Sequence, residues 1–377
     1  MTGTNMMKAA RLHAFGQPLR IDDIPTPDLR PDDVLVEVRG CGVVDNLNRV
    51  LANFFGAQRV MPDMPAIFGL DAVGVVAEVG SRVRAIRPGT RVYVNPGRGC
   101  GSCRPCRAGA TNECPDFTYT GYFGRSIQIM RDYPYGGLAQ YLTAPPSALV
   151  TLPDAVSFEG AARFGYLGTA YAALKKIEAG PGDSLLVNGV TGTLGVNAAM
   201  IALAMGVTKI LGTGRNLALL ERVKRLDPKR VEVFAFGAGG DDREEQESFR
   251  AWVRSHTDGY GADHLIDCMP PGAPASAISR ALSALRRGGR ATLVGAVMEE
   301  LSVEAFWLMT NAMRLEGSAW FTTRDGQEMA EMAAAGTLDL DVMDHRVYPL
   351  AQVNEGLAAI ERRQGGFDNF VIDPSAR

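Results

Sequence analysis

The sequence lacks a strong excess of charge of either sign. Its 377 residues include 39 Lys and Arg against 42 Asp and Glu, which gives a formal net charge of −3. Such a chain has no basic field to attract a nucleic-acid backbone or an anionic membrane, so we expect neither partner. Since 46% of the residues are hydrophobic and 21% are charged, the composition excludes a disordered tail. The length suggests two or three domains with buried cores.

Targeting and membrane-spanning signals are missing as well. Residues 1–7 do not show a charged region followed by an apolar one, so we predict no secretory signal and expect a cytoplasmic protein. One uncharged stretch, residues 184–207, is about long enough to span a bilayer. It contains two asparagines and four glycines, which favours a strand, turn and helix inside an α/β domain.

The pattern of apolar residues changes along the chain. Residues 33–39 alternate apolar and polar side chains, and residues 72–80 form another β-rich run, which predicts irregular β structure in the first part. From about residue 161, short strand-like runs alternate with helix-like stretches such as 194–205 and 275–287. This alternation indicates parallel βαβ units.

A glycine-rich turn follows the apolar run at 184–188 and opens an apolar helix. It reads Gly189-Val190-Thr191-Gly192-Thr193-Leu194-Gly195. Glycines at such a turn let the backbone approach a pyrophosphate, whose negative charge then lies against the positive end of the helix dipole. The spacing is G-x-x-G-x-x-G rather than the commoner G-x-G-x-x-G, and a merely packed turn is the alternative. The surrounding strand and helix favour a dinucleotide site formed by Gly189, Thr191, Gly192, Thr193, Leu194 and Gly195.

The next strand-like run ends about 20 residues beyond the turn, at Gly214-Arg215-Asn216. An acidic residue is expected there if the ribose 2′-hydroxyl of NAD is to be bound. Arg215 instead removes a repulsion and offers its guanidinium to a 2′-phosphate. The sequence therefore predicts NADPH/NADP as the cofactor, bound in part by Gly214, Arg215 and Asn216. The alternative is that Arg215 is only a surface residue and that either cofactor is used.

Four of the six cysteines lie close together, at Cys100, Cys103, Cys106 and Cys114. Their spacing can bring four thiolates around one ion in a tetrahedron, the geometry that Zn²⁺ prefers. Because four thiolates leave no open coordination position, we predict one structural zinc per chain. Disulfide bonds are the alternative, but they are rare in a cytosolic chain. The other two cysteines stand alone in apolar surroundings, where we expect them to pack in cores.

Together these features resemble the medium-chain dehydrogenase/reductase superfamily, the zinc alcohol dehydrogenase-like proteins. The resemblance covers nearly the whole chain. It rests on the four-cysteine segment, the glycine turn and three further segments that look like family landmarks. These segments are GLDAVGVVAEVG at 69–80, GTAYAAL at 168–174 and VYPLAQVNEGLAAI at 347–360.

The resemblance implies an α/β protein of two domains with the active site in the cleft between them. Residues 1–160 would form a GroES-like β-rich catalytic domain with a structural zinc lobe at about 97–116, completed by residues 318–377. Residues 161–317 would form a Rossmann domain with a doubly wound parallel sheet that binds NADP. The family-level expectation is a homodimer joined through the edge of the Rossmann sheet, with a tetramer as the alternative.

The departures from the family pattern concern the catalytic zinc. In such enzymes that ion is typically held by a Cys, a His and a third Cys or carboxylate, and the matching positions here are Val44, Leu70 and Gly165. None of these residues has a side chain that can coordinate a cation. The histidines of the chain lie elsewhere in the sequence, at positions 13, 256, 264 and 345. The resemblance therefore implies a structural zinc without a catalytic zinc.

Few polar groups remain for catalysis. Asn46 falls at the family's hydroxyl proton-relay position, and its amide could donate to a carbonyl oxygen or orient the nicotinamide. Asp71 matches a carboxylate beside the zinc site, although it could equally serve only to hold its loop. Tyr166 adjoins the vacant third ligand position and could act as a hydrogen-bond donor or proton source. Thr169 and Gly295 match positions where the chain would meet the cofactor.

Tyrosines beyond the zinc lobe are further candidates for contact with the substrate. They stand at Tyr119, Tyr122, Tyr133 and Tyr135, in a loop where substrate-facing residues are plausible. Packing or surface exposure is the alternative for each of them.

The missing zinc ligands direct the expected chemistry. Without a Lewis acid, an alcohol or simple carbonyl loses the interaction that stabilises an alkoxide. A conjugated enone needs less help, because hydride addition at its β-carbon gives an enolate that hydrogen-bond donors can stabilise, and an iminium ion carries its own activation. We expect an NADPH-dependent reductase of an activated C=C or C=N bond in an apolar or aromatic unsaturated small molecule. A zinc-independent carbonyl reductase or alcohol dehydrogenase, and a noncatalytic NADPH-binding protein, are the alternatives.

Overall fold

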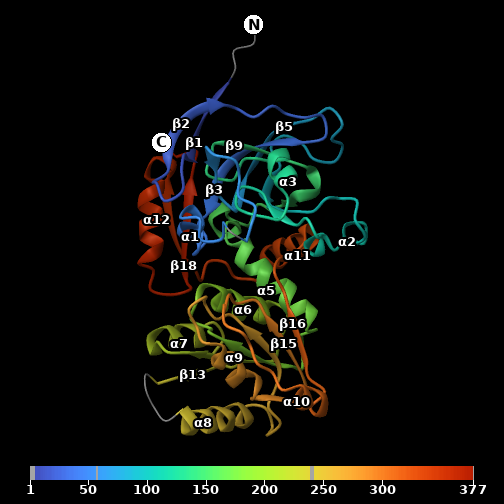
Figure 1. Ribbon diagram of the computed structural model, residues 1–377, viewed down its shortest axis with the longest axis vertical. Helices are drawn as coiled ribbons and strands as arrows, with labels where there is room; N and C mark the ends of the chain where they lie inside the picture. The colour runs from blue at the N-terminus through green and yellow to red at the C-terminus, as the bar shows by residue number, and fades with distance from the viewer. Residues whose placement is uncertain (1–4, 57, 238–241, 377) are drawn as a thin grey trace.

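The computed structural model describes residues 5–56, 58–237 and 242–376. The chain forms two domains, one above the other in Figure 1. The upper domain contains the first part of the chain together with the C-terminal strands, and the lower domain contains the middle of the chain. Helix α5 (Phe164–Lys176) lies where the two domains meet.

A seven-stranded sheet forms the centre of the β-rich domain. Its order is β10-β6-β5-β3-β18-β17, and β9 also pairs with β3. Two strands come from the C-terminal end, and β18 (Asp368–Asp373) pairs antiparallel with β3 (Val34–Gly42). The end of the chain is thus built into the sheet that begins near its start, and Figure 1 shows these red and blue segments side by side.

The other strands of this domain belong to the seven-stranded sheet, to a three-stranded sheet in the order β2-β1-β4, or to the two-stranded sheet β7-β8. They are β1 (Met6–Leu12), β2 (Arg20–Pro25), β4 (Ala66–Ile67), β5 (Asp71–Val79), β6 (Arg91–Val94), β7 (Gly97–Arg98), β8 (Thr118–Tyr119), β9 (Tyr141–Ala144), β10 (Leu149–Thr151) and β17 (Asp344–Pro349). The β structure expected at 33–39 and 72–80 is confirmed by β3 and β5. Val34, Val36 and Val38 alternate along β3, and all three are fully buried because successive side chains of a strand point to opposite faces.

The second domain is a doubly wound parallel sheet, which confirms the expected fold class. Its strands run in the order β13-β12-β11-β14-β15-β16, and every neighbouring pair is parallel. The direction of winding reverses between β11 and β14, and ligands of such sheets bind outside the carboxyl ends of the strands at this reversal. The six strands are β11 (Ser184–Asn188), β12 (Lys209–Gly214), β13 (Val231–Ala235), β14 (Ala262–Asp267), β15 (Leu285–Leu293) and β16 (Arg314–Gly317).

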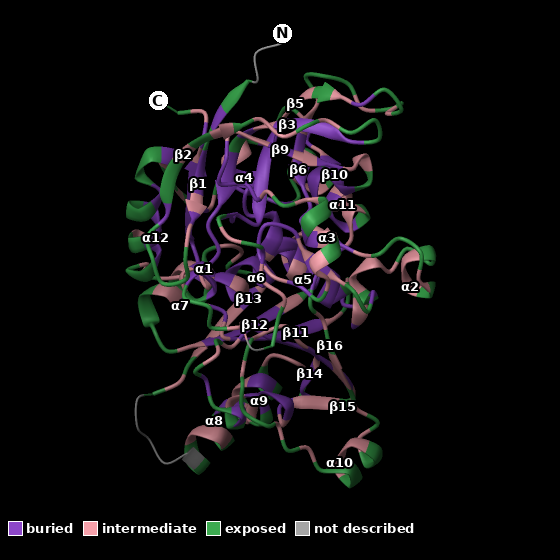
Figure 2. Cartoon of the chain, turned by 45° about the horizontal axis from the view of Figure 1, so that its top comes forward, coloured by how far each residue is buried: buried purple, intermediate pink, exposed green. Residues whose placement is uncertain are grey.

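The uncharged stretch 184–207 folds into β11, the glycine turn and helix α6 (Thr193–Ala204). Ala198, Ala199 and Ile201 are fully buried, because α6 packs between the sheet and α5. Figure 2 shows this part of the chain in the buried colour. None of the helices that the structure describes combines the length and the apolar character needed to cross a bilayer.

One helix is shorter than the sequence pattern indicated. The helix-like stretch 275–287 is helical only as α9 (Ala275–Leu282), and β15 already begins at Leu285. Leu285 pairs with Ala262 of β14, which makes it part of the parallel sheet. The local sequence pattern cannot distinguish a short apolar strand from the end of a helix, so it predicted too long a helix.

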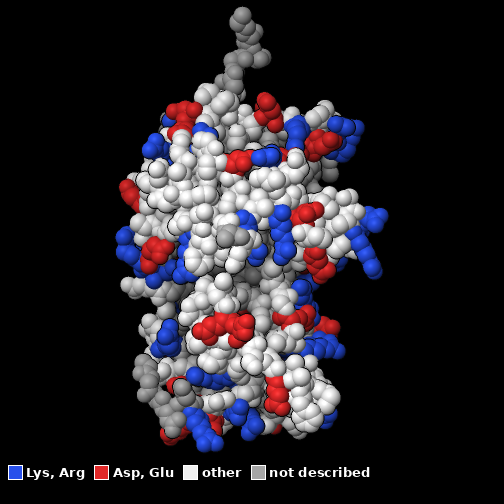
Figure 3. Space-filling view, viewed as in Figure 1, with Lys and Arg blue, Asp and Glu red and all other residues white. Residues whose placement is uncertain are grey.

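The other helices lie around the main sheets of the two domains. They are α1 (Leu47–Leu51), α2 (Arg104–Arg107), α3 (Ile127–Asp132), α4 (Phe158–Ala161), α7 (Leu217–Lys224), α8 (Asp242–Ser255), α10 (Ala305–Thr310), α11 (Thr323–Ala334) and α12 (Val353–Glu361). On the face shown in Figure 3, charged side chains of both signs are interspersed, as the near-neutral composition predicts.

Candidate functional site

The four clustered cysteines meet in the lobe that contains α2. Their sulfur atoms all lie within 4.8 Å of one another. A Zn–S bond of about 2.3 Å places the sulfurs of a tetrahedral site about 3.8 Å apart, and the Sγ atoms of Cys103 and Cys114 are 3.7 Å apart. All six cysteines of the chain are free thiols. The quartet Cys100, Cys103, Cys106 and Cys114 therefore fits one tetrahedral zinc and leaves no position open for a substrate.

Backbone N–H groups donate to two of the four sulfurs. The N–H of Cys103 donates to Cys100 Sγ at 3.4 Å, and the N–H of Cys100 donates to Cys114 Sγ at 3.3 Å. Donors from Ser102 and Cys103 hold the pKa of Cys100 below its usual range. A Cβ at Gly99 would lie 2.6 Å from Cys106 Sγ, so a residue without a side chain is needed for the loop to close.

The glycine turn connects β11 to α6 as the sequence predicted. Gly189 has a φ of +83°, which L side chains rarely adopt. A Cβ at Gly195 would lie 2.6 Å from Val190 Cα, so the helix can pack on the turn only with glycine there. Gly192 is the N-cap of α6 and provides no capping side chain, and the first turn has no acidic residue. The first N–H groups of the helix are thus left for an external acceptor.

One side chain at this turn lacks a partner. Thr193 is 5% exposed, and its hydroxyl makes no hydrogen bond with any residue that the structure describes. A buried hydroxyl without a partner is costly, and a phosphate oxygen at the helix N-terminus would supply the missing acceptor. Thr191 and Leu194, on either side, are partly buried. The turn therefore fits the pyrophosphate of a dinucleotide.

Gly214, Arg215 and Asn216 follow one another at the end of β12. A Cβ at Gly214 would lie 2.9 Å from Thr191 Cγ2, which places this strand end beside the glycine turn. Asn216 caps α7, because its side chain accepts from the N–H of Leu219 at 3.1 Å. Arg215 is exposed and forms no ion pair or hydrogen bond within the described part of the chain. Its guanidinium is available to a ligand.

Buried polar groups tie the strand ends together. The hydroxyl of Thr213 donates to Asn188 Oδ1 at 3.0 Å, and Asn188 Nδ2 donates to Asp267 Oδ1 at 2.8 Å. Burial raises the pKa of Asp267. The N–H of Gly295 donates to Asp267 O at 2.8 Å, so this predicted cofactor residue is fixed to the same network. Thr169, also predicted, donates its hydroxyl to Gly165 O at 2.7 Å within α5.

The three positions that the resemblance assigns to the catalytic zinc ligands are all buried. Val44 and Leu70 are each 7% exposed, and Gly165 is buried. A Cβ at Gly165 would lie 2.6 Å from Asp71 Oδ2 and closer still to Oδ1. The Asp71 carboxylate therefore fills the space where a ligand side chain at 165 would begin. Apart from the cysteine quartet, no three His, Cys, Asp or Glu groups gather closely enough for a metal among the described residues.

Asp71 is held in this place by a tyrosine that the sequence analysis did not identify. The Tyr93 hydroxyl donates to Asp71 Oδ1 at 2.8 Å, and Asp71 is 1% exposed. Burial raises the pKa of Asp71 to about 7, against the opposing effects of Tyr93, Arg163 and the Gly165 N–H. Because Tyr93 pairs with Val73 across β5 and β6, it shares a face with Asp71, two residues away. Only knowledge of that pairing could have revealed the contact.

Asn46 and two tyrosines gather next to Asp71. The hydroxyl of Tyr122 donates to Asn46 Oδ1 at 2.5 Å, which leaves the amide nitrogen of Asn46 as a donor. The hydroxyl of Tyr166 accepts from the N–H of Asp45 at 2.9 Å, and its own hydrogen is left for another acceptor. Burial raises the pKa of both Tyr122 and Tyr166, so both remain neutral phenols. Tyr122 thus contacts Asn46 and lies near enough to Asp71 and Tyr166 for their charges to raise its pKa as well.

The other tyrosines of the loop are not all at this place. Tyr119 packs edge-on against Trp320, with ring centroids 4.9 Å apart. Tyr133 donates to Asp33 Oδ1 at 2.9 Å, and the ring of Tyr135 is packed against the core of the β-rich domain. Among the four, Tyr122 is the one that contacts Asn46.

The C-terminal segment joins the site to the glycine turn, which sequence patterns did not indicate. The Arg163 guanidinium lies over the Tyr166 ring, 4.9 Å from its centroid, and donates to Gly366 O at 2.8 Å. The N–H of Gly366 in turn donates to Thr191 O at 3.0 Å. Arg363 pairs with Asp45 at 3.0 Å. A cofactor at the turn and a substrate at Tyr166 would therefore share one rigid wall.

Comparison with known proteins gives matches over both domains. The family model "Alcohol dehydrogenase GroES-like domain" matches residues 30–154, and "Zinc-binding dehydrogenase" matches residues 193–335. An alcohol dehydrogenase of Geobacillus stearothermophilus is 31% identical over 352 residues, which are 93% of this chain and 94% of that protein. An alcohol dehydrogenase of Rhizobium meliloti is 32% identical over 335 residues, 88% and 89% of the two chains. A solved NAD-dependent alcohol dehydrogenase has a TM-score of 0.80 at 26% identity, covering 97% of this chain and 99% of that one.

The raised pKa of Asp71 predicts a pH-dependent stability. The folded protein holds this proton more tightly than the unfolded chain, so the contribution of Asp71 to stability is full below its usual pKa of 3.8 and is lost as the pH rises to about 7. The variant Asp71→Asn removes this titration. We expect its melting temperature, relative to that of the wild type, to rise steadily between pH 4 and pH 7.

Thermal melts of both proteins across this pH range provide the measurement. The exposed Asp63, whose ion pair with Arg131 lowers its pKa, provides the control variant Asp63→Asn, which should show no such relative gain. Parallel pH profiles for the wild type and Asp71→Asn would contradict the assignment.

Proposed function

The chain belongs to the medium-chain dehydrogenase/reductase superfamily, as a zinc alcohol dehydrogenase-like oxidoreductase, and we propose that it is an NADPH-dependent reductase working without a catalytic zinc. The proposed reaction transfers hydride to an activated C=C or C=N bond. The observation that carries the proposal is the contact between Asp71 and Gly165, because a carboxylate stands where a ligand side chain would begin. With Val44 and Leu70 at the other two positions, the three ligand positions offer no imidazole, thiolate or carboxylate of their own.

The chain's own donors would stabilise the negative charge that forms on the substrate. The oxygen of Asn46 accepts from Tyr122, and its amide nitrogen has no hydrogen-bond partner among the described residues. The hydroxyl hydrogen of Tyr166 is a second donor, and the raised pKa of this phenol keeps the hydrogen in place. Donors fixed in a buried site stabilise an enolate oxygen without reorganisation. A bound nicotinamide would supply the hydride, Tyr166 would stabilise the resulting enolate by its hydrogen bond, and the enolate would take its proton from water.

The surroundings of these donors favour an apolar or aromatic unsaturated substrate. Val44 and Leu70, at two of the proposed ligand positions, are buried hydrocarbon side chains. The Tyr122 ring packs against the Phe123 ring, with centroids 4.8 Å apart. Such walls exclude water and offer apolar area to the substrate.

The preference for NADPH is supported by the free guanidinium of Arg215. Residues 212–216 include no acidic side chain, so nothing there would repel a 2′-phosphate or bind a 2′-hydroxyl as a carboxylate does. Gly214 brings this strand end against Thr191 of the turn. We propose that Arg215 contacts the 2′-phosphate.

The cysteine quartet is proposed to hold one structural zinc. Its sulfur spacing matches a tetrahedral thiolate site. Thiols persist in a reducing compartment, and we propose the cytoplasm as the place where the protein works.

We further propose a homodimer joined at the edge of the Rossmann sheet. Strand β16 pairs on one side only, with β15, among the strands that the structure describes. Nearby, Phe306 and Met309 of α10 are 65% and 67% exposed, which is unusual for large apolar side chains on a free surface. Light scattering on the wild type tests this, since a mass near the 40.4 kDa of one chain would contradict it.

The position of hydride transfer tests the proposed reaction. The protein is incubated with NADPH carrying deuterium at the 4R or the 4S position and with a simple conjugated enone. We expect deuterium at the β-carbon of the product, located by NMR. Deuterium only at the carbonyl carbon would contradict the proposal and indicate a carbonyl reductase. Tight NADPH binding without turnover of enones, quinones, imines or aldehydes would indicate a noncatalytic NADPH-binding protein.

The same assay on Asn46→Ala measures the donor's contribution. Loss of one such donor lowers kcat by about 10² to 10³-fold. Asn48, which donates to Leu357 O and Glu361 from the other side of α1, provides the control variant Asn48→Ala. An equal kcat for both variants would remove Asn46 from the mechanism.

Replacement of Arg215 tests the cofactor preference. Because a charge-assisted contact with a 2′-phosphate would be lost, Arg215→Ala should weaken NADPH binding by about tenfold while NADH binding stays the same. Titration of both cofactors by fluorescence gives the two dissociation constants. Arg225→Ala, at the other end of α7 and likewise exposed, is the control of equal charge. An equal effect of Arg215→Ala on both cofactors would contradict the assignment.

A further inference from the structure

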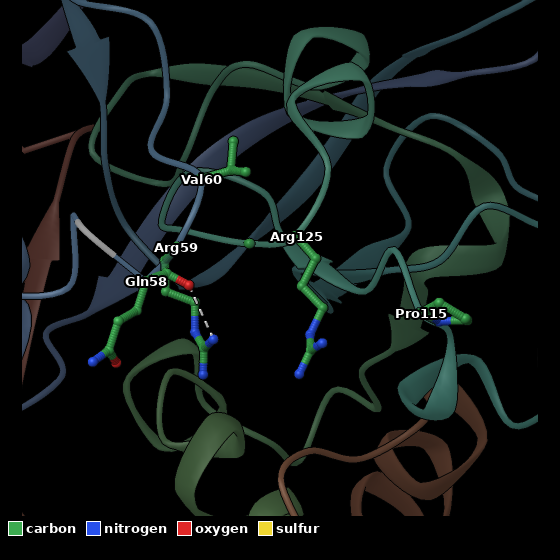
Figure 4. Close-up of a pocket in the computed structure, with 6 residues that line it drawn as sticks. Gln58, Arg59, Val60, Pro115 and Arg125 are labelled. Atoms are coloured by element: carbon green, nitrogen blue, oxygen red, sulfur yellow. Dashed lines mark hydrogen bonds between the residues drawn. The ribbon is translucent and has the colours of Figure 1, made fainter.

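A hollow of about 540 Å³ opens on the β-rich domain beside the zinc lobe. It is lined by Gln58, Arg59, Val60, Pro115, Gly124 and Arg125. Figure 4 shows the side chains of Arg59 and Arg125 extending in the same direction, away from that of Val60. The lining contains two guanidinium groups and no acidic side chain.

The backbone sets this direction. Val60 and Gly124 form an antiparallel bridge in which the N–H of each donates to the carbonyl oxygen of the other at 2.9 Å. Arg59 and Arg125 are the next residues on either strand of this bridge, so they stand opposite each other on the face that Val60 does not use. The backbone pairing therefore places the two arginines opposite each other, whichever rotamers their side chains adopt.

Within the part of the chain that the structure describes, no acidic side chain pairs with either arginine. Arg59 donates only to the carbonyl oxygen of Gln58, and Arg125 has no side-chain hydrogen bond or ion pair within the described residues. Like charges placed directly opposite each other across paired strands repel. A bound anion would relieve this repulsion, and bidentate guanidinium contacts suit carboxylate and phosphate oxygens.

An aromatic wall leads from the hollow to the catalytic residues. Phe123, next to Gly124 of the bridge, packs on Phe55 with ring centroids 5.4 Å apart and on Tyr122 at 4.8 Å. Tyr122 in turn donates to Asn46. One chain of packed side chains thus links the edge of the hollow to the place proposed for the reacting bond.

We propose that Arg59 and Arg125 bind an anionic group, a phosphate or a carboxylate, at the far end of the unsaturated substrate. The substrate then has an apolar reactive end beside Asn46 and a charged end in the hollow. This inference rests on the proposed reductase function and adds a substrate class to it. Arg59 and Arg125 determine specificity and take no part in hydride transfer.

Three matched enones test the proposal. Each is made as a series in which the linker between the reactive group and the far end increases in length. One ends in a carboxylate, one in its methyl ester and one in a phosphate monoester. In the wild type, the KM of an anionic enone should be at least about tenfold below that of the ester. Arg59→Gln/Arg125→Gln should remove this advantage, with the KM of the ester and all kcat values unchanged. The larger loss, with carboxylate or with phosphate, identifies the group.

Two controls accompany this comparison. Arg84→Gln/Arg87→Gln removes the same charge from an exposed loop of the same domain and should keep the preference for the anionic enones. Added salt should raise the KM of the anionic enones but not that of the ester.

The result that would overturn the proposal is a wild type that does not distinguish the anionic enones from the ester, or a double variant that still does. The saturated analogues make anion binding measurable without turnover, because calorimetry follows their binding to the complex with NADP⁺. If no enone is reduced but the saturated anions bind through the two arginines, the proposed reaction is wrong and the anion site stands.

Discussion

The proposed absence of a catalytic zinc rests on an excluded volume. Asp71 turns its carboxylate toward α5, and the chain can accommodate this only because residue 165 is glycine. Two groups cannot occupy one space, so a ligand side chain at 165 and this orientation of Asp71 are mutually exclusive. The Tyr93 hydroxyl holds the carboxylate in place, and burial makes its charged form costly. The position that the resemblance assigns to a metal ligand is thus part of a packed, hydrogen-bonded core.

The other two ligand sites of the fold keep their full sets of residues. The zinc lobe retains its four sulfurs at the spacing of a tetrahedral site, and the glycine turn retains both the close approach at Gly195 and the uncapped start of α6. Arg163 and Gly366 connect that turn to Tyr166. A chain with a dinucleotide site and no Lewis acid beside it would favour substrates that stabilise their own charge, as proposed here. The absence of ligand side chains at positions 44, 70 and 165 is thus the physical reason for the proposed chemistry.

Much of the fold could be predicted because it is recorded in local patterns. The period-two alternation around Val36 gives β3, and the strand-turn-helix pattern around Gly192 gives β11 and α6. Spacing alone placed the four cysteines together. The contacts of Tyr93 with Asp71 and of Tyr122 with Asn46 could not be foreseen, because they join segments far apart in the sequence. The paired arginines were missed for the same reason, since nothing near Arg59 or Arg125 in the sequence indicates that they face each other.

The most direct test of the central claim is the zinc content of the wild type, purified without added metal or chelator and measured by mass spectrometry of the element. One zinc per chain is the predicted result, and it should fall to zero when Cys100 and Cys103 are both replaced by Ser. Two zinc ions per chain in the wild type would contradict the account, because the second ion requires a metal site outside the cysteine quartet.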